Sequence, residues 1–153
     1  MATARVQEAV LSNEVNLFVN KGTTASPNFV MVGCATSKDY GLAINTITLN
    51  CDNGKIKIAP EEPDFDLQLT GFVFQYATAN VAANVSAREF EEWASEFPQA
   101  PREYKLAGRH TGDLVREFEA VIASFRETGS NGEARTYSVS FQISGTPELS
   151  DQA

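Results

Sequence analysis

Strict alternation of apolar and polar side chains is the feature of this sequence that most limits its fold. Residues 137–144 alternate Tyr, Val, Phe and Ile with Ser, Ser, Gln and Ser, and residues 15–19 place Val15, Leu17 and Val19 two positions apart. Successive side chains of a β-strand point to opposite faces, so this period predicts strands with one buried and one wet face. We therefore expect antiparallel sheets that cover a core on one side.

Seven segments carry this alternation or the β-branched and aromatic residues that strands favour: 14–20, 28–36, 40–49, 65–76, 102–109, 114–126 and 135–144. Turn-forming residues separate them, including Ser37, Lys38 and Asp39, which predict that 28–37 and 40–49 form a hairpin that turns near Asp39. So many strands leave little room for a doubly wound α/β fold. The predicted class is mainly β, an antiparallel β-sandwich or barrel with one flanking α-helix.

One helix is predicted, over residues 86–97. Ser86 and Glu89 match the capping box that begins a helix. Phe90, Trp93 and Phe97 then recur at helical spacing before Pro98, which cannot continue the helix. We expect these three aromatic side chains to pack against a sheet.

Length and charge limit the class of protein. A chain of 153 residues is the size of one domain, and we expect that domain over 14–149, between an arm at 1–13 and a tail at 150–153. The formal net charge of -8 argues against proteins that grip nucleic acids or anionic membranes, because both partners require basic patches. No segment approaches the roughly 20 apolar residues of a membrane helix, and the first residues lack the apolar centre of a signal peptide.

Residues that could support catalysis or bind a metal are few and scattered. His110 stands alone in a glycine-bounded turn three residues before Asp113, an arrangement more typical of an exposed turn than of half a catalytic pair. Cys34 and Cys51 show no metal-binding spacing, and we expect both to be free thiols. The sequence thus predicts no catalytic site, no metal and no cofactor.

The long connection from Cys51 to Asp64 is the first candidate for a contact surface, since long polar loops in small domains are usually functional or disordered. We expect its acids Glu61, Glu62, Asp64 and Asp66 to meet bases such as Lys55, Lys57 or Arg102 across a subunit interface. The terminal segments 1–13 and 147–153 are the competing candidates, because both are polar and unpatterned. The candidate residues of the loop are Asp52, Asn53, Lys55, Lys57, Glu61, Glu62, Asp64 and Asp66.

The order of these features resembles the major tail tube protein of long-tailed bacteriophages. The likeness covers about 14–149 and rests on a strand over 15–22, a strand that ends at 32–38, a long loop, strands on either side of one helix, and a closing segment at 137–147. The glycine-and-tryptophan lead that usually follows the long loop is replaced here by Lys, Ile, Lys, Ile, Ala and Pro at 55–60.

The resemblance implies a β-sandwich whose six copies close into a ring, and rings that stack into a tube. DNA would then pass through the lumen without specific binding, and an acidic lining would not hold phosphates. Tape measure, terminator and distal tail proteins would be partners, in the virion tail and, during assembly, in the host cytoplasm. Alternatives are a tube subunit of a contractile tail or related injection system, a monomeric β-barrel that binds a ligand, and a hydrolase that depends on His110.

Overall fold

Antiparallel strands make up most of the structure. The computed structural model describes residue 4 and residues 6–153, and its largest sheet has seven strands in the order β2-β1-β7-β8-β9-β6-β3. A separate pair joins β4 (Ile47–Cys51) to β5 (Gly54–Ile58). The strands of the large sheet are β1 (Val15–Asn20), β2 (Phe29–Met31), β3 (Ala35–Ala43), β6 (Asp64–Phe72), β7 (Arg102–Gly108), β8 (Leu114–Thr128) and β9 (Thr136–Asp151).

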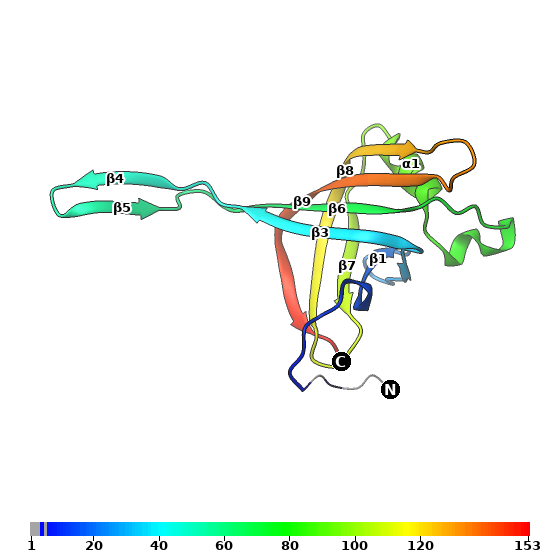
Figure 1. Cartoon of the computed structure of the whole chain (residues 1–153), viewed down its shortest axis with the longest axis horizontal. Coiled ribbons are helices and arrows are strands. Elements are labelled where there is room, and N and C mark those ends of the chain that lie inside the picture. Colours follow the sequence, from blue (N-terminus) through cyan, green and yellow to red (C-terminus); the bar gives the residue numbers. More distant parts are fainter. Residues whose placement is uncertain (1–3, 5) are drawn as a thin grey trace.

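The large sheet forms two layers because β8 and β9 are long and bend. The first part of β9 pairs with β6, whereas the first part of β8 pairs with β7. The register of β8 against β9 shifts between Glu117 and Glu119 and again between Ile122 and Ser124. Irregularities of this kind bend strands and increase their twist. Figure 1 shows both strands turning from one layer into the other, so one continuous sheet builds the predicted sandwich.

The core lies between the layers and uses the alternating residues. Tyr137, Val139 and Phe141 of β9 are almost wholly buried, whereas Ser138 between them and Gln142 after them are exposed. The rings of Tyr104 and Phe141 meet edge to face with their centroids 4.9 Å apart, which joins β7 to β9. The alternation in the sequence therefore selects the buried face, and the predicted fold class is confirmed.

Helix α1 (Ala87–Ala94) covers one side of this core. The Glu89 carboxylate accepts a hydrogen bond from the backbone amide of Ser86 at 2.9 Å, as in a capping box. Phe90 is fully buried, and its ring lies 5.7 Å from that of Phe141. Trp93 is 8% exposed, and the Arg102 guanidinium lies 4.3 Å from the centre of its ring.

The prediction that Phe97 packs on the sheet is wrong. The helix ends at Ala94, and the Phe97 side chain is fully exposed. Residues that precede proline avoid the α conformation, so Pro98 ends the helix before the last aromatic residue of the pattern. Helical spacing therefore identifies Phe90 and Trp93 but does not extend to Phe97.

The predicted hairpin that turns near Asp39 is also wrong. Asp39 lies inside β3, opposite Gln68 of β6, and the chain turns earlier, at Gly33 and Cys34. Cys34 has a φ of 52°, a conformation rare for a residue other than glycine. The polar residues that suggested a turn occupy an edge strand instead, where polar side chains are common.

The region from Cys51 to Asp64, predicted as a long irregular loop, contains β5, and β4 ends at its first residue, Cys51. The turn between β4 and β5 is made by Asp52 and Asn53, and the alternation of Lys and Ile over 55–58 continues β5 after Gly54. At the other end, β9 continues to Asp151, so the segment from Pro147 is ordered within the sheet. Of the predicted N-terminal arm, residues 1–3 and 5 lie outside the described residues, and Ser12–Glu14 form a 3-10 helix.

Trp93→Ala should lower the free energy of unfolding by about 3–5 kcal/mol, because it removes a buried aromatic ring. Phe97→Ala is the matched control, since that ring is fully exposed, and it should change stability by less than about 0.5 kcal/mol. Urea denaturation of both variants measures the difference. Equal losses would show that Trp93 is not part of the core.

Candidate assembly surfaces

The most unusual surface is a two-stranded arm, which we define as residues 47–58. Figure 1 shows it extending away from the body of the molecule on the chain between β3 and β6. All ten residues of its two strands are exposed. No other part of the described chain covers these strands. Because an isolated two-stranded hairpin is only marginally stable in water, the arm gains stability if another surface covers it.

The two faces of the arm differ in chemistry. Side chains directly opposite one another share a face, so Ile47 with Ile58 and Leu49 with Ile56 form one apolar face. Their exposed fractions run from 40% to 52%. The opposite face carries Thr48, Asn50, Lys55 and Lys57.

Five of the eight predicted interaction residues lie on the arm or at its base. Asp52 and Asn53 lie at the tip of the arm, and Lys55 and Lys57 lie on its polar face. Glu61 is at the base, where its carboxylate accepts a hydrogen bond from the Asn45 side chain at 2.8 Å.

The remaining acids lie in or beside the sheet. Glu62 stands just before β6, whereas Asp64 and Asp66 belong to β6 and lie opposite Ala43 and Gly41. Arg102, one of the three predicted partner bases, pairs with Glu96 of the same chain at 3.0 Å. The prediction missed the apolar face, although alternating isoleucines at 56 and 58 signal it.

A second surface is the outer face of the layer that contains β3, β6 and the first part of β9. Gln68 donates a hydrogen bond to the Ser140 hydroxyl at 2.7 Å across β6 and β9. Asp39 and Asp66 contribute acids, and Arg126 of β8 contributes a base. The neutral side chains of this face include Gln68, Thr70, Thr136, Ser138, Ser140 and Gln142.

A third surface is an acidic groove of about 290 Å³ on the outer face of the other layer, across β7, β8 and β9. Its glutamates are Glu103, Glu117, Glu119 and Glu148. Glu103 lies directly opposite Glu119, and Glu117 lies directly opposite Glu148. Like charges in such positions destabilise a sheet. Asn20 reduces this repulsion by donating a hydrogen bond to Glu103 at 3.0 Å, and Lys105 is opposite Glu117 in the register of β7 and β8.

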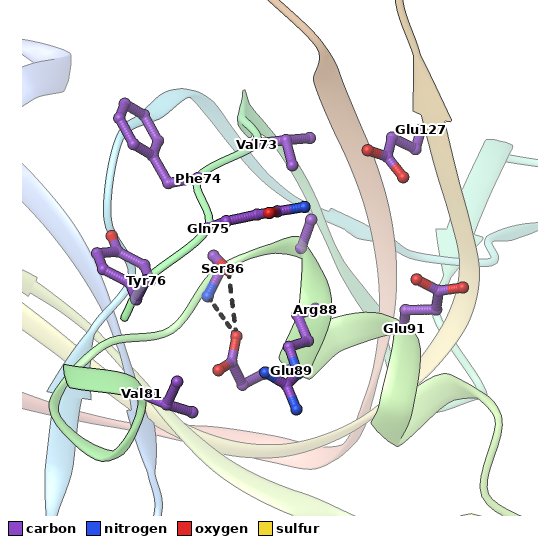
Figure 2. Close-up of a pocket in the computed structure, with 11 residues that line it drawn as sticks. Val73, Phe74, Gln75, Tyr76, Val81, Ser86, Arg88, Glu89, Glu91 and Glu127 are labelled. Carbon is purple, nitrogen blue, oxygen red and sulfur yellow. Dashed lines mark hydrogen bonds between the residues drawn. The ribbon is translucent and has the colours of Figure 1, made fainter. Parts of the chain in front are cut away.

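A cleft of about 370 Å³ lies between the start of α1 and the segment that follows β6 (Figure 2). Its lining includes three carboxylates, from Glu89, Glu91 and Glu127. Glu89 is already engaged with Ser86 in the helix cap. Burial, together with neighbouring Cys34 and Glu89, raises the pKa of the Tyr76 hydroxyl. A lining this acidic does not suit the apolar ligand of a small β-barrel binder.

The candidate catalytic residues have structural contacts. The His110 ring lies 3.3 Å from the Glu14 carboxylate, and Asp113 accepts a hydrogen bond from the backbone amide of His110. Such a side-chain-to-backbone bond stabilises a turn. Cys34 and Cys51 are free and exposed. Among the described residues, no group of three or more His, Cys, Asp or Glu is placed to hold a metal, and no helix could span a membrane.

Comparisons with known proteins identify the fold. No protein-family model matches the sequence, and a search of curated proteins finds no match. Among solved structures, the SPP1 tail tube gives a TM-score of 0.69 at 11% identity, covering 94% of this chain and 80% of that one. The tail of an empty gene transfer agent particle, refined with C6 symmetry, gives 0.66 at 16% identity and covers 95% and 100%. This chain has a tail-tube fold.

A related match has the same fold in a contractile assembly. The sheath-tube complex of an extracellular contractile injection system gives a TM-score of 0.66 at 11% identity, covering 97% of this chain and 94% of that one. In this chain the fold presents three distinct surfaces: an arm with two unlike faces, a largely neutral polar face and an acidic groove.

Glu119→Gln should stabilise the subunit by about 0.2–1 kcal/mol, because it removes the like charge opposite Glu103. Glu133→Gln is the control, since Glu133 is exposed and lies outside the strands. The Tm of each variant, measured by thermal unfolding at low protein concentration, is compared with that of the wild-type protein. A lower Tm for Glu119→Gln would show that the groove glutamates do not repel one another.

Proposed function

We propose that this chain is a structural subunit, not an enzyme. Six copies would close into a ring, and the rings would stack into a tail tube. The unpartnered arm carries this proposal, because its apolar face has no cover in its own subunit. The tail-tube fold and the C6 symmetry of the gene transfer agent tail support a ring of six copies.

Burial of the arm against another copy would contribute much of the assembly energy. Full burial of an aliphatic side chain is worth about 1.5–3 kcal/mol, and the four apolar side chains of the arm are about half exposed. Covering them therefore contributes roughly 3–6 kcal/mol per arm. Each ring would present six arms to its neighbours, so stacking would be strongly cooperative.

The free edges of the sheet support ring closure. The large sheet ends at β3 on one side and at β2 on the other, and a free edge presents unpaired backbone groups. A closed ring in which sheets of neighbouring copies meet removes such edges, as in a barrel with a wide channel. β3, with nine residues, offers the longer edge.

We infer that the outer face of β3, β6 and β9 lines the lumen. The side chains of this face carry hydroxyl and amide groups that can hydrogen-bond to one another, as Gln68 does to Ser140. Arg126 of β8, opposite Ser138 of β9, contributes a positive charge to the face. Phosphates bind tightly where several bases release counterions. A neutral to acidic wall would therefore let DNA slide without specific binding.

The tube of a contractile system is the alternative that shares this fold, as the match to a sheath-tube complex indicates. A non-contractile phage tail is our proposal, with tape measure, terminator and distal tail proteins as partners in the virion and the host cytoplasm as the site of assembly. Co-purification of a sheath protein with the native tube would favour the contractile alternative.

Electron microscopy of the purified chain tests this proposal. The wild-type protein should form rings of six that stack into tubes as its concentration rises. A chain that stays monomeric in sedimentation at every concentration would overturn the proposal and favour a monomeric binder.

Replacement of residues 47–58 by a short Gly-Ser linker should leave a folded subunit, since the arm strands pair only with each other in the described chain. Loss of the apolar face should prevent rings from stacking into tubes. A matched variant with Thr48→Ser and Asn50→Ser, on the opposite face, should still stack. Normal tubes without the arm would assign stacking to the terminal segments.

A further inference from the structure

We propose that the polar face of the arm, here called its basic face because it carries Lys55 and Lys57, binds the acidic groove of a second copy. This inference rests on the proposed function, and it adds which surface receives the arm. A ribbon exposed on both faces fits between two copies, with its apolar face against one and its basic face against the other.

Charge complementarity selects the second copy as the occupant of the groove. The arm carries Lys55 and Lys57 on one face, and the structure shows no ion pair for either lysine within the described part of the chain. Glu117 and Glu119 likewise show no ion pair within it. An interface that joins these groups would satisfy both surfaces at once.

Spacing supports the pairing. Lys55 and Lys57 are two positions apart on β5, so their side chains share a face and their Cα atoms lie about 6.8 Å apart. Glu117 and Glu119 are also two positions apart on β8 and face the same side, in regular register with β7. Two lysines on one strand can therefore meet two glutamates on another without a change of backbone.

The groove also has a reason to accept positive charge. Glu103 opposes Glu119, and Glu117 opposes Glu148, so two like-charged pairs face one opening. Lys105 is the base nearest to them by register, but its ammonium group lies over the rings of Phe18 and Phe29, 5.1 and 4.7 Å from their centres. Lysines from outside would relieve the repulsion that remains.

Reciprocal charge reversal tests the pairing. Lys55→Glu with Lys57→Glu should raise the critical concentration for tube formation by about tenfold or more, and so should Glu117→Lys with Glu119→Lys. The protein with all four changes should return to within about threefold of wild type, because the charges attract again. Arg88→Glu with Arg109→Glu is the matched control, since both arginines are exposed and lie outside the arm and groove.

Each outcome has a meaning. Thermal unfolding of every variant separates a loss of assembly from a loss of folding. The pairing is wrong if the variant with both lysines changed assembles as the wild-type protein does. It is also wrong if the protein with all four substitutions does not regain assembly. In both cases the wild-type protein still forms tubes, so the proposed function stands. If the wild-type chain forms no tubes at all, the proposed function fails and this inference fails with it.

Discussion

The pairing of β8 with β9 is the interaction on which both layers of the molecule depend. These strands have 15 and 16 residues and take part in both layers, so one hydrogen-bonded ladder carries the sheet around its bend. The bend brings Tyr104 of β7 against Phe141 of β9, and Phe90 of the helix packs beside Phe141. Without the bend, the alternating strands would have one apolar face and no partner layer to cover it.

The arm and the two outer faces follow from this closed core. The alternating apolar residues of the body form its buried core, whereas Ile47, Leu49, Ile56 and Ile58 form a separate apolar face on an extended ribbon. A contiguous exposed face of this kind marks an interaction site. The body offers surfaces of different charge around it, a neutral polar face on one layer and an acidic groove on the other. This division of chemistry suits a subunit surrounded by copies of itself.

The sequence predicts the parts of the fold that follow from local pattern. The alternation in 137–143 predicts the buried face of β9, and the capping box at Ser86 predicts the start of α1. It fails where tertiary context prevails over local signals. The polar run around Asp39 suggests a turn, but that segment lies in an edge strand, and Pro98 ends the helix before Phe97.

The candidate assembly surfaces could be predicted only in part. The sequence predicts a contact surface over 51–66 and assigns the contact to its acids, but it does not predict the apolar face of the arm. The groove is invisible in the sequence, because Glu103, Glu117 and Glu148 come together only through the register of three strands. Cross-strand register depends on pairings between segments far apart in the chain, which local composition does not specify.

A helical reconstruction of the assembled wild-type protein by electron microscopy is the most direct test of the central claim. The account predicts rings of six, with the face of Gln68 and Ser140 toward the lumen and the apolar face of every arm buried against another copy. A reconstruction in which the arms stay exposed, or in which another face lines the channel, would contradict it.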